Sequence, residues 1–277
     1  MNRTWIALAA VFLAAIFGMS LSGYNRSNRA QEGVAGGVKP MTVAPVVIVE
    51  LFTSEGCSSC PPADQLLKKL SEEQPIHGVQ VVALEEHVDY WNHQGWKDPF
   101  SDAEFSRRQE DYAGAIHNGG VYTPQMIVDG QVEVTGSQGR KAWEAIEQSA
   151  RMPKAIVEVS PAAGEAGPSA AFDLRVSNAP GEASRKKLEL WLALTEKGLH
   201  SDVKAGENSG ETLQHAAVVR SLQKIAVVQA DEPFTKRVTP NLKQEWKREQ
   251  LSLVAFLVEK GSRKIVGGAM TPFISKN

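Results

Sequence analysis

The sequence predicts an α/β protein in two parts: strands and helices alternate over residues 42–152, and a smaller β-rich domain follows over residues 153–277. Residues 46–52 form an apolar, β-branched run typical of a buried strand, and two cysteines and an amphipathic helical pattern come directly after it. In the second part, strand-like runs succeed one another without helices between them. This pattern favours an antiparallel, sandwich-like domain.

The N-terminal pattern predicts a targeting segment. Arg3 precedes an apolar run over 6–19, and the small residues at 20–22 offer a cleavage site, so we expect a signal peptide over 1–22. An uncleaved anchor is the alternative, although the run is shorter than the ~20 residues a spanning helix needs. Residues 23–41 are polar and glycine-rich, which predicts a flexible linker. We therefore expect an extracytoplasmic protein, periplasmic or secreted, with membrane contact only through an uncleaved N-terminal segment.

Composition and charge exclude one class of function. The 277 residues carry a formal net charge of −2, with both signs mixed along the chain. A nucleic-acid surface would need a basic patch or stripe, which the sequence lacks. The expected partner is instead a protein with a thiol or a disulfide, and the oligomeric state is left open.

Hydrophobic periodicity and turn signals predict the individual elements. In the first part they are a strand over 46–52, a helix over about 60–72, a strand over 79–84, a helix opened by a capping box at 101–104, a hairpin at Asp129-Gly130, and a helix over 138–150 with Trp143, Ile146 and Ala150 on one face. In the second part they are strands over 155–159, 172–176, 188–195, 216–228, 251–259 and 264–270, with a solvated face or short helix at 236–250.

Cys57 and Cys60 are the only cysteines in the chain, and they stand at the predicted start of a helix. The positive end of the helix dipole favours a thiolate there. We expect Cys57, the more exposed of the two, to attack a partner and Cys60 to resolve the mixed disulfide. Two alternatives stay open: a structural disulfide, or a metal clamp completed by His87, Asp89 or His93. The preferred interpretation has no metal and no cofactor.

The order strand-helix-strand-helix-strand-strand-helix, with the cysteines after the first strand, is that of the core thioredoxin fold. Residues 46–150 thus resemble a thioredoxin-like domain. In this resemblance Thr123 and Pro124 occupy the place of the cis-proline loop, which implies that they bind a substrate peptide. Glu50 is nearest to the buried acid of thioredoxins but stands one position away, and one step along a strand reverses the face.

A narrower resemblance rests on residues 50–62, 87–91, 95–100, 121–125 and 206–213 and on His215. These stretches resemble a family of exported bacterial proteins known as domain of unknown function 1223 (DUF1223). The resemblance covers almost all of the chain after the linker. It implies a thioredoxin-like fold and names no established substrate.

Residues 87–100 are predicted to be an insertion that borders the cysteines, because loops after parallel strands gather at one edge of a sheet. Trp91 and Trp96 would then line a substrate-binding wall, or else fill the space under the insertion. Residues 206–210 indicate a turn with a packing role. His215 lacks the neighbours of a hydrolase triad and is expected to be structural.

Together these features predict an exported thiol–disulfide oxidoreductase or redox-partner protein that acts through Cys57 and Cys60. The alternative is a non-catalytic thioredoxin-like binding module in which the cysteine pair is a metal clamp or a structural disulfide. The two hypotheses differ in whether Cys57 reacts as a thiolate below the free-thiol pKa of about 8.5.

Overall fold

The computed structural model describes residues 44–116, 120–162, 170–179, 187–229 and 232–273. The chain from Val43 onward forms one compact unit. The expected signal peptide and linker lie outside the described residues. Within the described ranges, no helix is both long and apolar enough to cross a membrane.

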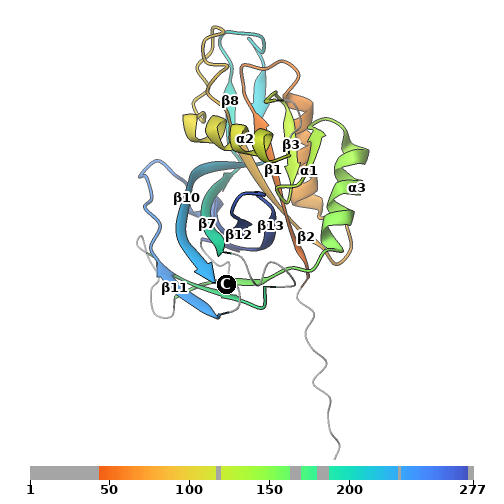
Figure 1. Cartoon of the computed structure of the whole chain (residues 1–277). Helices are drawn as coiled ribbons and strands as arrows, with labels where there is room; N and C mark the ends of the chain where they lie inside the picture. Colours follow the sequence, from red (N-terminus) through yellow and green to blue (C-terminus); the bar gives the residue numbers. More distant parts are fainter. Residues whose placement is uncertain (1–43, 117–119, 163–169, 180–186, 230–231, 274–277) are drawn as a thin grey trace, which may run out of the picture. The chain divides into compact units, whose positions relative to one another are not determined.

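A mixed eight-stranded sheet forms the centre of this unit, in the order β13-β12-β7-β10-β2-β1-β3-β4 (Figure 1). Its strands are β1 (Val46–Thr53), β2 (Gln80–His87), β3 (Gln125–Val128), β4 (Val132–Thr135), β7 (Lys187–Lys197), β10 (Ala217–Gln229), β12 (Leu251–Glu259) and β13 (Ile265–Pro272). A three-stranded sheet contains β5 (Ile156–Pro161), β6 (Phe172–Ser177) and β11 (Phe234–Val238), and a two-stranded sheet contains β8 (His200–Asp202) and β9 (Thr212–Gln214).

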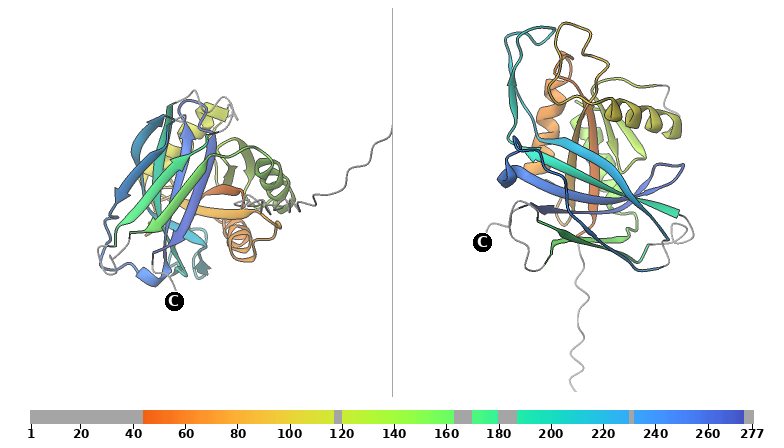
Figure 2. Two further views of the ribbon diagram at one scale, coloured as in Figure 1. Left: turned by 90° about the horizontal axis from the view of Figure 1, so that it is seen from below. Right: turned by 90° about the vertical axis from the view of Figure 1, so that its left-hand side faces the viewer.

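Three α-helices pack against the N-terminal part of the large sheet. They are α1 (Pro61–Glu73), α2 (Ala103–Ile116) and α3 (Gly139–Ala150), and a short 3-10 helix, η2, spans Arg248–Gln250. Apolar residues of α1 and α3 share one core with alternate residues of β1, whereas Phe105 of α2 packs on the opposite face with Ile48. The first half of the sheet is therefore covered by helices on both faces (Figures 1 and 2).

The two predicted parts meet within the large sheet rather than in separate sheets. β10 pairs in parallel with β2 through Val218 and Glu85, and antiparallel with β7 along its length. The three-stranded sheet packs on this second half, where residues of β6, β7 and β12 form one apolar core. The C-terminal strands are antiparallel to one another as predicted, but through β10 they extend the sheet that begins with β1.

Most predicted elements appear within a few residues of their expected ends, but β8 and β9 were not predicted, and four further details differ. β2 continues three residues further than predicted, through Glu85, Glu86 and His87. Asp102, rather than Ser101, caps α2 by accepting the N–H of Glu104 at 2.8 Å. Trp143 does not lie on the buried face of α3, which consists of Ala142, Ala145, Ile146 and Ser149. The stretch 236–250, expected to be a solvated face or a short helix, begins with the last residues of β11.

A buried ion pair attaches α2 to the sheet. Nε of Arg108 donates to Glu50 at 2.5 Å and lies 3.6 Å from Glu86, while the Tyr112 hydroxyl donates to the other oxygen of Glu50 at 2.5 Å. Burial and the neighbouring Glu50 carboxylate raise the pKa of Glu86 well above its usual value. Glu50 thus faces away from α1, as the strand alternation predicted, and its partner is the arginine.

Replacing Arg108 with alanine should lower the free energy of unfolding by about 3–5 kcal/mol, because Glu50 would remain buried without its countercharge. Urea unfolding followed by far-UV circular dichroism measures this loss. Arg140→Ala is the matched control, since Arg140 is 90% exposed and its pair with Glu144 is 4.0 Å long. The control should change stability by no more than about 0.5 kcal/mol. Equal losses in the two variants would contradict the assigned role of Arg108.

Candidate functional site

The two cysteines form a disulfide in the turn that connects β1 to α1. The N–H of Cys57 donates to Ser54 at 3.1 Å, and the N–H of Cys60 donates to the Cys57 carbonyl at 3.1 Å. Cys60 is the N-cap of α1, with Pro61 in the first turn, where no N–H is needed. The disulfide therefore lies at the positive end of the helix dipole.

Both cysteines are buried, with Cys57 1% and Cys60 0% exposed, whereas Ser58 and Ser59 between them are exposed. Cys57 was expected to be the more exposed of the two, but the difference is only 1% and neither cysteine lies at the surface. The cause is tertiary, because segments distant in sequence pack over the turn. A reagent would need these segments to move before it could reach either sulfur.

One of these segments is the connection between β8 and β9. The Asn208 side chain donates to the carbonyls of Glu55 and Cys57 at 2.8 and 3.0 Å, and Glu207 accepts the N–H of Ser58 at 2.9 Å. Gly206 has a φ of +78°, and a Cβ there would lie 3.2 Å from the Trp96 side chain. The expected packing turn is therefore present, and it also binds the cysteine turn directly.

The predicted insertion, residues 87–100, lies along another side of the cysteine turn. The indole N–H of Trp96 donates to Glu55 at 2.7 Å, and that of Trp91 donates to the Thr123 hydroxyl at 2.8 Å. A Cβ on Gly56 would lie 3.3 Å from the Trp91 side chain, which places this indole between the turn and Thr123. The structure thus brings both tryptophans to the cysteine turn.

The peptide bond between Thr123 and Pro124 is cis, as the sequence predicted. Pro124 lies near the start of α1, because a Cβ on Gly136 would contact both Pro124 and Ala63 at 2.9 Å. The carbonyl of Pro124 accepts the N–H of Gly136 at 2.9 Å. All the site residues expected from the sequence therefore gather at one end of β1 and α1.

The metal clamp considered from the sequence does not form in the described residues. The cysteine sulfurs are bonded to each other, Asp89 accepts from Ser106 at 2.5 Å, and His93 is exposed. His87 instead points into the protein, where Nδ1 lies 2.7 Å from Asp98. Within the described residues, the group of possible metal ligands that lie close together contains neither cysteine.

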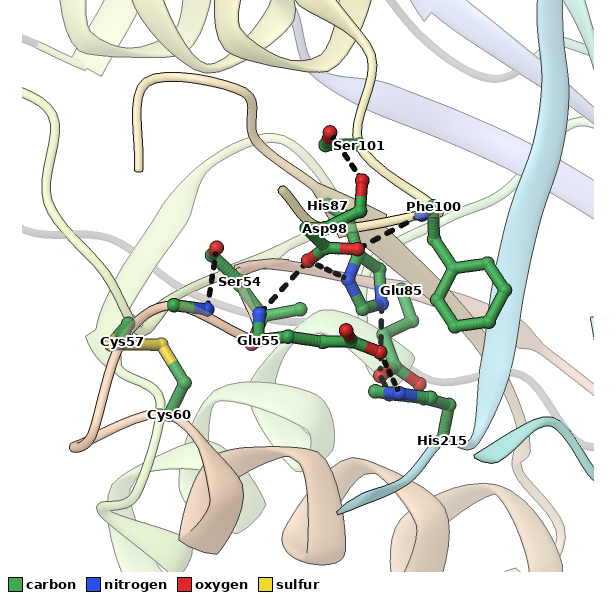
Figure 3. A network of polar contacts seen from close by, with 12 residues as sticks. Ser54, Glu55, Cys57, Cys60, Glu85, His87, Asp98, Phe100, Ser101 and His215 are labelled. Carbon is green, nitrogen blue, oxygen red and sulfur yellow. Dashed lines mark hydrogen bonds and ion pairs between the residues drawn. A yellow bond between two sulfur atoms is a disulfide. The ribbon is translucent and has the colours of Figure 1, made fainter. Parts of the chain in front are cut away.

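A buried polar cluster that the sequence analysis missed lies behind the disulfide (Figure 3). We call Glu55, Glu85, His87, Asp98 and His215 the inner cluster. Glu85 and His87 are two apart on β2 and so share a face, and His215 is brought beside them by the pairing of β10 with β2. The one sequence signal was the run of charged residues directly after the apolar part of β2, at the same sheet edge as the cysteines.

Burial and charged neighbours shift the pKa values of the inner cluster in opposite directions. Burial alone would lower the pKa of His215, but its hydrogen bonds to Glu55 and Glu85, at 3.0 and 2.8 Å, raise it to about 9. Burial alone would raise the pKa of Glu85, but the hydrogen bond with His215 and the nearby imidazole of His87 lower it to about 2. The cluster thus retains its charges within the protein interior.

Asp64 is a second buried carboxyl near the cysteines. It lies in the first turn of α1, where its N–H donates to the Cys60 carbonyl at 3.1 Å and its carboxylate accepts from the Thr53 hydroxyl at 2.6 Å. Burial, and then the charge of Glu85, raise its pKa from 3.8 to about 7. Asp64 can therefore exchange a proton near neutral pH, within one helical turn of Cys60.

The pKa of Asp64 predicts a pH-dependent difference between the wild type and Asp64→Asn. The folded pKa of about 7 exceeds the unfolded reference of 3.8, so the folded wild type loses stability as pH rises from about 4 to about 7. The asparagine variant does not titrate there. As pH rises from about 4 to about 7, its free energy of unfolding should therefore increase relative to that of the wild type. Urea unfolding of the oxidised proteins measures this difference.

Glu72→Gln, a change at an exposed carboxyl on the same helix, is the control. A difference between wild type and Asp64→Asn that stays constant from pH 4 to pH 7 would contradict the prediction.

Replacing Asn208 with alanine should uncover the disulfide. The carbonyls of Glu55 and Cys57 would lose their side-chain donor, which costs about 1–3 kcal/mol for buried groups. Reduction by dithiothreitol should be about tenfold faster for each 1.4 kcal/mol by which the substitution destabilises the state with the turn closed over the disulfide. Ser209→Ala, at the exposed neighbouring position, should reduce at the wild-type rate. The explanation fails if Asn208→Ala is reduced no faster than this control.

Fold and site together define a mixed α/β protein with a disulfide at a helix N-terminus and a buried polar cluster behind it. The chain belongs to the family described as protein of unknown function (DUF1223), whose family model matches residues 48–258. The family resemblance stated from the sequence is thereby confirmed, and the family description states no activity.

The solved structures similar to this chain include two that each match 83% of it. A protein from Agrobacterium tumefaciens shares 26% identity with a TM-score of 0.64, over 83% of this chain and 96% of that one. HBP35 of Porphyromonas gingivalis shares 14% identity with a TM-score of 0.61, over 83% of this chain and 76% of that one, and shows likeness of fold alone. A comparison with curated proteins finds no match.

Proposed function

We propose that this protein is an exported, thioredoxin-like thiol–disulfide oxidoreductase or redox-partner protein. The observation that carries the proposal is the Cys57–Cys60 disulfide, located between β1 and the first turn of α1. The order β1-α1-β2-α2-β3-β4-α3 and the cis bond before Pro124 add support, because both agree with the resemblance to thioredoxin-like proteins.

The location of the disulfide favours exchange chemistry. A disulfide that closes so short a loop stabilises a fold only weakly, since the entropic gain grows with loop length. When the pair is reduced, the N-terminus of α1 stabilises a thiolate. Ser59 adds a polar contact, because its hydroxyl lies 3.3 Å from the sulfur of Cys57. Cys57 is therefore the attacking sulfur in this proposal.

The exchange balances without a further reactant. In the reduced protein, the Cys57 thiolate attacks one sulfur of a partner disulfide, forms a mixed disulfide and releases the other partner sulfur as a thiolate. Cys60, after losing its proton, attacks the sulfur of Cys57 and releases the second partner thiolate. The pair is oxidised by two electrons and the partner is reduced by two. The reverse sequence oxidises a partner dithiol.

The surroundings of the disulfide suggest how a partner is positioned. Trp91, Trp96, Thr123 and Pro124 would contact the partner chain beside Cys57, and backbone groups of Thr123 would pair with an extended segment. The contacts of Asn208 with the cysteine turn must open first, since Cys57 is 1% exposed. In this proposal the partner is a protein and nucleic acid is excluded. The oxidising environment that export provides would maintain the disulfide.

Burial of both cysteines favours a second candidate. A disulfide that no partner reaches would be a structural feature of a non-catalytic binding module, with the turn of residues 206–210 permanently closed over it. The two candidates differ in the accessibility and acidity of Cys57 after reduction.

A Cys60→Ser variant tests the two candidates. In the folded protein we expect Cys57 to react with iodoacetamide with a midpoint well below pH 8.5, and to trap a disulfide substrate as a stable mixed disulfide. Cys57→Ser is the matched control, and its buried Cys60 should react slowly and trap nothing. If Cys57 reacts only after denaturation, the redox proposal is wrong and the binding module is favoured.

A further inference from the structure

We propose that Glu85, His87 and His215 form a binding site for a divalent transition-metal ion of the Zn²⁺ type, in the protein interior behind the disulfide. The site uses no cysteine sulfur. It is therefore different from the metal clamp considered above, and it does not depend on the proposed redox function.

The spacing of the donor atoms suits a single ion. Oε1 of Glu85 lies 2.8 Å from Nδ1 of His215 and 3.4 Å from Nε2 of His87, and the candidate ligand atoms of the three residues all lie within 4.8 Å of one another. Zinc bonds to histidine nitrogen and carboxylate oxygen are about 2.0–2.2 Å, so tetrahedral ligand atoms stand about 3.4 Å apart. Small side-chain rotations would bring the three atoms onto one ion.

Both histidines also have the outer partners typical of metal ligands. Nδ1 of His87 lies 2.7 Å from Asp98, and Nε2 of His215 lies 3.0 Å from Glu55. A metal-binding histidine usually donates its second N–H to a carboxylate, which orients the ring and directs the other nitrogen at the ion. Figure 3 shows both rings next to Glu85, with Asp98 joined to His87 and Glu55 joined to His215.

An independent observation points to a ligand at this position. Nε2 of His87 is completely buried and makes no hydrogen bond within the described residues. A buried polar atom without a partner costs free energy, and a bound cation would supply that partner. The nitrogen faces Glu85 at 3.4 Å, which is longer than a hydrogen bond but suits two ligands of one ion.

The charges around the site favour a cation. Glu85, Asp98 and Glu55 bring three carboxylates into the interior, where they raise the pKa of both histidines, and a bound divalent ion would replace the protons that the two imidazoles carry. The second oxygen of Glu85 accepts the N–H of Ala216 at 2.5 Å, which fixes the carboxylate while Oε1 faces the imidazoles. Two histidines and one carboxylate are a common donor set for Zn²⁺, and they leave a position for water or another ligand.

A cavity lies next to the site. A cavity of about 320 Å³ is lined by His215 together with Gln214, Lys68 and the start of β8. Asp64 lines a neighbouring cavity of about 430 Å³ between α1 and β9. The inner cluster therefore adjoins this cavity on the β8–β9 side, although the His215 side chain itself is 1% exposed.

The test is titration of the full chain with Zn²⁺ alone, after EDTA treatment and with the disulfide intact, so that no thiolate is available. Isothermal titration calorimetry and metal analysis after dialysis should show one ion per chain. His215→Gln and Glu85→Gln should weaken binding by at least about 100-fold, and Asp98→Asn by about 10–100-fold, the range typical of outer partners. His200→Gln, an exposed histidine beside the same cavity, is the matched control and should bind like the wild type.

Failure to bind one ion, or equal affinity in His200→Gln and His215→Gln, overturns the proposal. Co²⁺ added to the unaltered protein gives a second readout that does not depend on how the variants fold. A visible spectrum of four- or five-coordinate Co²⁺ with nitrogen and oxygen ligands supports the site. The weak spectrum of hydrated Co²⁺ at one equivalent overturns it.

Discussion

Buried carboxylates at the ends of β1 and β2 require partners, and much of the tertiary arrangement meets this requirement. Glu50 and Glu86 face one side of the sheet, where Arg108 of α2 pairs with Glu50, while burial and Glu50 raise the pKa of Glu86. Glu85 faces the other side and is bound by the side chain of His215 and the backbone of Ala216, 130 and 131 residues away. These contacts join α2, the central strands and the C-terminal half in one structure.

The same region holds the cysteine turn in position. Glu55 is the link, because its side chain contacts His215 and Trp96, while its N–H donates to Asp98 at 2.8 Å. Asn208 closes the turn from the other side. Glu55 therefore contacts both the inner cluster and the insertion that borders the cysteine turn. The two proposals thus concern neighbouring groups with separate chemistry.

The second half of the chain contributes directly to the site around the cysteines. The turn at 206–210 covers the cysteines, and His215 enters the inner cluster just before β10. This follows from the parallel pairing of Val218 with Glu85, which places the start of β10 at the edge of the sheet where β1 and β2 end. At the boundary predicted at residue 153, the sequence changes from alternating strands and helices to successive strands. The large sheet nevertheless contains strands from both sides of this boundary.

The sequence by itself determined the local features: the strand before the cysteines, the helix that starts at Pro61, the hairpin at Asp129 and the strands of the second half. These follow from periodicity and turn chemistry, which act over a few residues. Only the tertiary structure decided that Cys57 is buried and that His215 meets Glu85. Those contacts depend on which strands become neighbours, and strand order is set by packing between residues too distant in sequence for any local pattern to indicate.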